Sequence, residues 1–523
     1  ETAWQLPAHN SYIRDTPQLI LPDVTRPVMD LFACETGALL ACAAYLLEEE
    51  FNAVSPFILT CIEDNLKRRI LLPYLTAHFW WMGHDDEPMC NWTVWCTQNV
   101  LLTTFLMPWS VEMSSRLSSP VRTFCGNAPL FLPENTSDTV VTLQAILHKA
   151  AESCDYFLKD YGNDGCCEEG AQYYRHAGLC LYGAMTVLNT VTDGHFDTLF
   201  RWDKVKNIAS YILNVHVNDK YYFNFADCSP IAGRAGVREY LFGKATGQED
   251  LCLFAAKDFQ AGQGQLVTDE VNGGNLFYRM QTVFHYEELM QQNTSGILSH
   301  RDVYYPSVGL FLVHSDTLDL AVKAGDNADS HNHNDTGSIT LYKNGLPILA
   351  DIGVETYTRK TFSPRRYEIW TMQSGYHNLP TICGTDQKDG VEYRAENVMT
   401  VLTGAEPSIS MELAAAYPAA QSTVPDLTYV RRVTLKKSSN TVVLEDHTNA
   451  QDVILNFITY EKPVILSDGK LSIGEASASF EGADLLAIET LPITDARLKT
   501  AWDHDLYRIR LKGNDAGFRL TIQ

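Results

Sequence analysis

The sequence is short of positive charge. Its 523 residues include 64 acidic side chains against 40 basic ones, which leaves a formal net charge of −24 at pH 7. A chain that binds nucleic acid or an anionic membrane surface through its charge needs clustered lysine and arginine. We therefore exclude nucleic acids and membranes as partners. The hydrophobic content of 45% and the charged content of 20% are those of folded globular proteins, so the acidic excess does not indicate disorder.

The sequence also lacks paired cysteines and long apolar runs. Its 13 cysteines include no Cys-x-x-Cys pair, which argues against a thiolate zinc site, and we expect reduced thiols packed in the core. The longest apolar stretch, near Gly37 to Leu47, ends at three glutamates and is too short to span a bilayer. No signal peptide is visible, although the chain begins at Glu1 instead of Met. We expect a cytoplasmic protein.

Helical periodicity dominates the chain to about residue 295. Between Val140 and Leu158 apolar side chains recur every three or four positions, and similar stretches surround 39–47, 179–188 and 205–215. No repeat with a fixed period is found in these residues. Several amphipathic helices with short connections predict a helical bundle, a solenoid or a toroid. Proline, serine and glycine between Pro108 and Pro133 indicate an insertion made of loops.

From about residue 300 the periodicity changes to that of strands. Val433 and Leu435 alternate with polar residues, and the same alternation recurs at 453–457 and 507–511. Many short strands with turn signals between them predict an antiparallel β-sandwich. Helices first and strands second predict an α+β multidomain chain. We place the helical domain at residues 1–297 and the β domain at residues 298–523.

The densest group of metal-binding residue types lies between residues 331 and 377. His331 and His333 are two positions apart, so they would point the same way on a strand. Asp351 follows after a hairpin-like Lys-Asn-Gly turn, and His377 lies farther along the chain. Two imidazoles and a carboxylate that converge suit zinc or a similar divalent ion. The alternative is an exposed polar loop whose histidines have ordinary hydrogen-bond partners.

Two further clusters lie in the helical half. Residues 168–176 place glutamates, tyrosines, an arginine and a histidine around Gly170. An arginine or histidine beside a tyrosine favours the phenolate, which lets tyrosine act as a base despite its ordinary pKa near ~10. The alternative is a helix N-terminus with ordinary polar residues. Residues 90–96 combine aromatic side chains with amides, a composition that is more often core than sugar-binding surface.

Taken together, five segments resemble the heparinase II/III-like polysaccharide lyases. In chain order they are Asn91-Trp92, Glu169-Gly170-Ala171-Gln172-Tyr173, His331-Asn332-His333 with Asp335 and Ser338, Ala350-Asp351-Ile352-Gly353, and Tyr376-His377-Asn378. The resemblance covers roughly residues 75–385 at the level of motifs and the later strands as a type of domain. It implies an incomplete (α/α) toroid followed by an antiparallel β-sandwich, with the substrate cleft between them.

The resemblance also implies a reaction and the residues that perform it. Enzymes of this family cleave uronic-acid-containing polysaccharides by β-elimination. Tyr173 would serve as base and acid, while Asn91 and His331 would neutralise the uronate carboxylate. A structural metal ion, usually zinc, would be held by His333, Asp351 and His377. The expected substrate-binding residues are Trp92, Gln98, Glu169, Tyr222, Arg234 and Arg238. Arg365 and Arg366 could contact substrate too, with an internal salt bridge as the alternative for each arginine.

The expected substrate is an acidic oligo- or polysaccharide, either a heparin- or heparan-sulfate-type glycosaminoglycan or alginate. Because net charge describes the whole surface, a locally positive cleft is compatible with the acidic total. Many relatives have histidine directly after the active-site asparagine, whereas Trp92 stands there in this chain. Two alternatives therefore stay open, a uronyl C5-epimerase and a non-catalytic protein that binds acidic glycans. A homo-oligomer is a further expected assembly.

Overall fold

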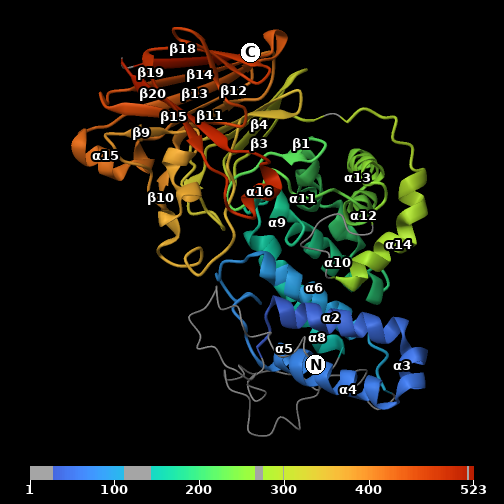
Figure 1. Ribbon diagram of the computed structural model, residues 1–523. Coiled ribbons are helices and arrows are strands. Elements are labelled where there is room, and N and C mark those ends of the chain that lie inside the picture. The colour runs from blue at the N-terminus through green and yellow to red at the C-terminus, as the bar shows by residue number, and fades with distance from the viewer. Residues whose placement is uncertain (1–27, 111–142, 266–274, 299, 515–516) are drawn as a thin grey trace. The chain divides into compact units, whose positions relative to one another are not determined.

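The computed structural model describes residues 28–110, 143–265, 275–298, 300–514 and 517–523 (Figure 1). The chain divides into two compact units. The first comprises Glu1–Gly162, Arg175–Ala209 and Arg234–Gly296, and the second comprises Asn163–Tyr174, Ser210–Gly233 and Ile297–Gln523. The second unit thus includes two segments from the helical half of the sequence. The domain boundary that we expect after residue 297 stays a prediction, and most of the expected insertion at 108–133 lies outside the described residues.

The first unit is built from helices. They are α2 (Leu31–Leu46), α3 (Glu48–Val54), α4 (Phe57–Leu66), α5 (Leu72–Thr76), α6 (Asn91–Leu106), α8 (Leu143–Asp160), α10 (Gly178–Val191), α12 (Val237–Thr246), α13 (Glu249–Ala261) and α14 (Leu276–Gln291). Helix α6 packs against α2, α8 and α10, and most of its side chains are buried. Helix α11 (Asp203–Asn214) begins in this unit and ends in the second. The predicted helical stretches are confirmed for the described residues, and the start of the first stretch at 140–142 lies outside them.

Local sequence explains how some of these helices begin and which face they bury. The Asp30 carboxylate accepts the Ala33 N–H at 2.8 Å and caps the start of α2. On α8 the buried side chains include Ile146, Ala150 and Phe157, which recur at helical spacing. Among the described helices no single one is long and apolar enough to cross a membrane. Helices α2 and α3, bent by 85°, meet that length and composition test only as a pair.

The second unit contains two large antiparallel sheets. The first has eight strands in the order β11 (Glu396–Val401), β12 (Ser408–Glu412), β13 (Tyr429–Lys436), β14 (Thr441–Thr448), β21 (Gly517–Ile522), β18 (Ala476–Glu481), β17 (Lys470–Ile473) and β16 (Val464–Ser467). The second has β19 (Ala483–Leu491), β20 (Leu506–Gly513), β15 (Val453–Thr459), β8 (Leu346–Leu349), β7 (Ile339–Lys343), β5 (Leu318–Lys323), β4 (Leu310–His314) and β3 (Val303–Tyr305), and β9 (Pro380–Ile382) pairs with β15.

Short elements complete this unit. They are helix α9 (Gly170–Tyr174), the ribbon of β1 (His216–Asn218) with β2 (Tyr221–Tyr222), the pair of β6 (Asp326–Asn327) with β10 (Gly390–Arg394), and helices α15 (Pro418–Thr423) and α16 (Leu498–Ala501). Helix α9 and the ribbon come from the two segments that precede residue 297 in the chain. They bring residues of the helical half into the unit that contains the sandwich.

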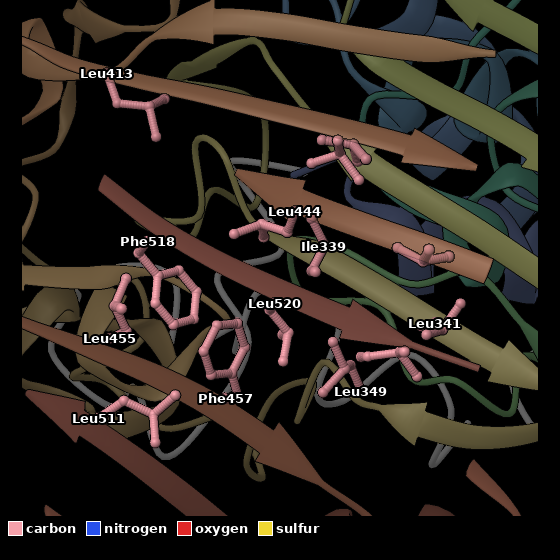
Figure 2. Close-up of a cluster of buried hydrophobic side chains, with 14 of the residues drawn as sticks. Ile339, Leu341, Leu349, Leu413, Leu444, Leu455, Phe457, Leu511, Phe518 and Leu520 are labelled. Carbon is pink, nitrogen blue, oxygen red and sulfur yellow. The ribbon is translucent and has the colours of Figure 1, made fainter. Parts of the chain in front are cut away.

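A single apolar core joins the two large sheets. Leu444 on β14 and Phe518 and Leu520 on β21 come from the first sheet, and Leu455 and Phe457 on β15 come from the second (Figure 2). All belong to one buried cluster, as expected when the inward faces of two sheets pack together. The alternation predicted at 433–435, 453–457 and 507–511 is confirmed, because these residues lie in β13, β15 and β20.

Candidate active site

Tyr173 lies in the short helix α9, whose start requires glycine. Gly170 has φ of +82°, and a Cβ atom there would lie 2.7 Å from the Cys228 Cβ, so a larger residue would be strained and would clash. The Tyr173 ring stacks on the His331 imidazole, with ring centroids 4.5 Å apart and planes 21° apart. The Tyr173 hydroxyl makes a short hydrogen bond with the hydroxyl of Tyr357. A phenol and an imidazole are thus held face to face.

His331 and His333 lie in a loop before β7 and not on a strand, so the strand geometry that would point both the same way does not apply to them. His331 has a positive φ of 59°. A non-glycine residue in this left-handed region needs surrounding contacts to hold it. Arg366 provides them, because its Nη2 donates to the His331 carbonyl at 2.9 Å and its Nε donates to the Asn332 carbonyl at 3.0 Å.

The Asp227 carboxylate connects most of the site, and its side chain is completely buried. Oδ2 lies 2.8 Å from His331 Nδ1 and accepts from the Tyr357 hydroxyl at 3.1 Å. Oδ1 lies 3.0 Å from His333 Nε2 and accepts from Arg366 Nη2 at 2.6 Å. Burial acts to raise the pKa of Asp227, but the hydrogen bonds from His331 and His333 outweigh it and hold this pKa well below the ordinary value. Asp227 is therefore a carboxylate at neutral pH.

The same contacts set the charge states of the imidazole and the phenol. Burial lowers the pKa of His331, but the hydrogen bond to Asp227 and the nearby Glu169 carboxylate raise it above the ordinary value overall. Burial raises the pKa of Tyr173 to about 12, and the Arg497 guanidinium acts in the opposite direction. Arg497 lies over the Tyr357 ring at 4.5 Å and donates to the Asp227 carbonyl at 3.1 Å. The site therefore pairs a protonated phenol with an imidazole that is biased toward its cationic form.

The candidate metal centre consists of His333, Asp351 and His377. All three are buried, and one ligand atom from each lies within 4.8 Å of the others. Among the described residues, His333 Nδ1 and His377 Nε2 are buried without a hydrogen-bond partner. Buried imidazole nitrogens in this state are stabilised when they ligate a metal ion. These residues therefore fit a divalent ion, and the predicted grouping is confirmed as a set that could hold a metal.

Other buried polar groups hold the metal-binding residues in place. The Asp351 carboxylate accepts from Gly353 N at 2.9 Å and Asn224 Nδ2 at 3.2 Å. The Asn378 side chain follows His377 and joins β7, β15 and the residue after β8, because its Nδ2 donates to the carbonyls of Ile339 and Ala350 while its Oδ1 accepts from Ile458 N. Such outer contacts orient the ligands of a metal.

An ion pair inside the sandwich supports the same loops. Arg431 on β13 and Asp446 on β14 are buried cross-strand neighbours, joined by hydrogen bonds of 2.8 and 2.9 Å. The remaining Arg431 nitrogen, Nη1, donates to the carbonyls of Gly337 and Asn378 at 2.8 Å each. The arginine thereby fixes the loop ends that follow His333 and His377.

Of the predicted residues in the second unit that have not yet been placed, Glu169 lies near the His331 imidazole. Its buried carboxylate is 3.6 Å from His331 Nε2. Tyr222 is fully buried, with its ring edge-on to His216. Arg365 is exposed and forms a bidentate pair with Glu368. The alternative that we gave for Arg365 and Arg366, an internal salt bridge, is therefore observed for both.

The other predicted residues belong to the first unit. Asn91 is buried at the first position of α6, and the Trp92 ring lies 5.1 Å from that of Trp80. Gln98 donates to the Tyr278 hydroxyl at 2.5 Å, and the Arg238 guanidinium lies 3.8 Å from the centre of the Tyr278 ring. Arg234 pairs with Asp258 at 2.6 Å. The roles assigned to Asn91, Trp92, Gln98, Arg234 and Arg238 stay predictions.

Sequence reasoning missed three residues that complete the site, Asp227, Tyr357 and Arg497. None belongs to a motif, and each comes from a segment outside the regular strands and helices. One signal was available for Asp227, because it closely follows the aromatic run 221–225 that contains the predicted Tyr222. Arg497 lies 270 residues from Asp227 in the chain, a separation over which residue patterns carry no information.

Comparison with known proteins gives a family match in the β part. Residues 299–453 match the family model described as heparinase II/III-like, C-terminal. This region is therefore similar to the C-terminal domain of that family. The domain contains His331 and the three candidate metal ligands, so the resemblance on these residues is confirmed. A comparison with curated proteins gives no match.

Solved structures share the fold of the chain beyond this domain. A heparinase III, the BT4657 gene product, has 13% identity and a TM-score of 0.55 over 94% of this chain. A mutant of heparan sulfate lyase HepC from Pedobacter heparinus has 12% identity and a TM-score of 0.58 over 98%. Chondroitin AC lyase from Streptomyces coelicolor A3, in complex with chondroitin sulphate, has 10% identity and a TM-score of 0.51 over 98% of this chain. The predicted fold class, an incomplete (α/α) toroid followed by an antiparallel β-sandwich, is confirmed.

These structures are longer than the chain. The matched part covers 66% of the heparinase III, 70% of HepC and 77% of the chondroitin lyase. The chain thus spans about two thirds of the length of the first two. At this low identity the likeness concerns the fold alone.

Proposed function

We propose that this protein is a polysaccharide lyase that cleaves uronic-acid-containing glycans by β-elimination. One observation carries the proposal, the stacking of the Tyr173 phenol on the His331 imidazole beside Asp227, Tyr357 and Arg497. The reaction needs a proton acceptor and donor next to a group that neutralises negative charge on a carboxylate. The phenol and the imidazolium are the residue types that perform these two tasks.

The proposed step begins at C5 of the uronate, where the carbon bears a proton next to the carboxylate. Tyr173 Oη takes this proton, the C4–O4 bond breaks, and a C4–C5 double bond forms. The proton then passes to the departing O4, so one tyrosine serves as base and acid. His331, whose pKa is raised by Asp227 and Glu169, neutralises as an imidazolium the charge that develops on the uronate carboxylate. Asn91 is the second proposed donor to that carboxylate.

Proton transfer requires a phenolate, and the site favours the protonated phenol at rest because the Tyr173 pKa is about 12. Hydrogen bonds suggest where the phenol proton goes. Tyr357 donates a hydrogen bond to Asp227, so transfer of the Tyr173 proton to Tyr357 across their short bond moves the Tyr357 proton onto the Asp227 carboxylate and leaves Tyr173 as the phenolate. Arg497 beside both rings stabilises the negative charge that remains.

A divalent ion at His333, Asp351 and His377 is proposed as structural, with zinc as the expected metal. Bound there, it would supply fixed positive charge and rigid ligand geometry to the turn that carries His331. Protein side chains also position His331, since Arg366 holds its backbone carbonyl and Asp227 holds its ring.

The proposed substrates are glycosaminoglycans of the heparin or heparan sulfate type and, as a second uronate class, alginate. The test is incubation with a panel of defined uronate oligosaccharides while the ultraviolet absorbance of the unsaturated product is recorded. We expect an increase with at least one member. No increase with any member would refute the lyase. Solvent deuterium at C5 without cleavage would identify an epimerase, and binding without either change would identify a glycan-binding protein.

A further inference from the structure

A second group of metal-binding side chains lies in the second unit and shares no residue with the site described above. His300, His314 and Asp319 each offer one ligand atom, and these atoms all lie within 4.8 Å of one another. His300 precedes β3, while His314 ends β4 and is the register partner of Asp319 on β5. Three segments that are neighbours at one end of the sheet thus converge on one point.

His314 is the best defined of the three. Its side chain is 8% exposed, and its Nδ1 lies 2.7 Å from Asp319 Oδ1. Without an ion this pair shares a proton, and an ion that displaces the proton would be faced by both Nδ1 and Oδ1. Among the described residues the other ring nitrogen, Nε2, is buried and has no hydrogen-bond partner. His314 is thus a buried imidazole that lies beside a carboxylate and has unused hydrogen-bonding capacity.

His300 supplies a second imidazole beside the His314 ring. Its ring centroid lies 5.1 Å from that of His314, and the two planes are inclined by 53°. The His216 ring lies edge-on to His300 at 6.0 Å, and the Phe223 ring lies 6.1 Å from His314. Aromatic rings therefore shield the cluster on the side of β1 and the segment after β2, while half-buried His300 leaves an approach for an ion.

We propose that His300, His314 and Asp319 bind a divalent transition-metal ion of the zinc class, separate from the ion expected at His333, Asp351 and His377. Two imidazoles with one carboxylate favour zinc, cobalt, nickel or copper over calcium and magnesium, which prefer oxygen ligands. The ion would join the segment before β3 to β4 and β5. Because β3 is the edge strand of its sheet, the ion would stabilise that edge.

The experiment counts zinc ions in the full chain. The protein is stripped with a chelator, reloaded with Zn²⁺ and freed of excess ion, and zinc per chain is measured by mass spectrometry. We expect two ions per wild-type chain, one in His300→Ala, one in His314→Ala and one in His377→Ala. The double variant His300→Ala with His377→Ala should bind none. His148→Ala is the matched control, because His148 is 78% exposed on α8, and it should retain two.

The outcomes separate this site from the first one. Two ions in wild type that persist in both His300→Ala and His314→Ala would overturn the proposal, and so would a single ion that only His377→Ala removes. A single ion that only His300→Ala removes would support this site and count against the other. Circular dichroism checks folding of each variant. If His314→Ala fails to fold, His300→Ala decides the matter, because His300 lies outside the strands and is only half-buried.

Discussion

His331 and His333 bind the two oxygens of one buried carboxylate. His331 Nδ1 lies 2.8 Å from Asp227 Oδ2, and His333 Nε2 lies 3.0 Å from Asp227 Oδ1. One histidine stacks on Tyr173, the proposed catalytic tyrosine, and the other is a candidate metal ligand. Asp227 therefore couples the reacting part of the site to the metal centre through its two oxygens.

Replacement of Asp227 by asparagine should weaken both parts of the site together. An amide offers one acceptor oxygen and no charge, so His331 and His333 cannot both keep their present contacts. We expect lyase activity to fall and zinc affinity at the first centre to drop by about 10–100-fold, measured by competition with a chelating dye. Asp86→Asn is the control, because that side chain is 97% exposed. Unchanged zinc affinity in Asp227→Asn would contradict the coupling.

Tyr173→Phe should separate catalysis from binding. The ring and its stacking on His331 remain, whereas the hydroxyl that exchanges the proton is lost. We expect kcat to fall by about 10²–10⁴-fold, while the affinity for an oligosaccharide measured by calorimetry stays near that of wild type. Tyr45→Phe, at a tyrosine that is 63% exposed, should leave both values unchanged. Full turnover in Tyr173→Phe would remove this residue from its proposed role.

Removal of metal should lower the thermal stability of the protein. An ion that binds only the folded state at 100 times its Kd adds about 2.7 kcal/mol to the free energy of unfolding. We expect a chelator to lower the Tm of wild type, and added zinc to restore it. His377→Ala should show a smaller response, because its buried imidazole is one of the expected ligands. An equal chelator response in the two proteins would count against zinc at this centre.

The buried pair of Arg431 and Asp446 should matter more than an exposed pair on a neighbouring strand. Arg431→Met leaves the Asp446 carboxylate buried without its cation, which destabilises a fold by about 3–5 kcal/mol. Arg519 on β21 pairs with Glu445 of β14 at the surface, and Arg519→Met should cost less than about 1 kcal/mol. Urea unfolding of both variants measures the difference. An equal decrease in the free energy of unfolding in the two variants would show that burial does not determine the strength of the Arg431–Asp446 pair.

Acid should remove one stabilising contribution in the first unit. Lys244, His285 and Tyr240 surround Glu288, and the hydrogen bonds from Lys244 and His285 lower its pKa from 4.5 to about 2. Because the Glu288 pKa is lower in the folded state, its ionised carboxylate stabilises the fold above pH 4.5. This stabilisation is lost as the pH falls from 4.5 toward about 2. We expect the Tm difference between wild type and Glu288→Gln to shrink over this range. A difference that is constant with pH would contradict the shift.

The sequence was sufficient to predict the fold and the site where a local residue pattern indicated the structure. Alternation placed Val433 and Leu435 in a strand, and the same alternation puts Arg431 on the inward face. A charged residue at such a position predicts a buried partner, and Asp446 supplies it as the direct cross-strand neighbour. The choice of His333, Asp351 and His377 as the metal ligands came from the family resemblance, because spacing alone also allowed His331 as a ligand.

The site residues that could not be predicted are brought together by contacts between loops that are remote in sequence. Tyr357, Asp227 and Arg497 meet at Tyr173 through backbone that has no periodic pattern, and Ala226 before Asp227 has an unusual positive φ of 53°. Such conformations arise from tertiary packing, which outweighs local preference. The left-handed backbone of His331 belongs to the same class, because Arg366 holds it from 35 residues away.

The assignment of Asn163–Tyr174 and Ser210–Gly233 to the same unit as the sandwich has a consequence for the order in which the protein is made. Tyr173 and Asp227 leave the ribosome well before the strands, and Arg497 follows Asp227 only 270 residues later. The partners of the Asp227 carboxylate follow it by 104 to 139 residues, and until they are made the carboxylate stays hydrated, since burial of an unpaired charge is unfavourable. The two segments of the helical half therefore cannot complete their contacts until the later part of the chain has been synthesised. A fragment that begins at residue 298 would contain His331 and the metal ligands, yet neither Tyr173 nor Asp227.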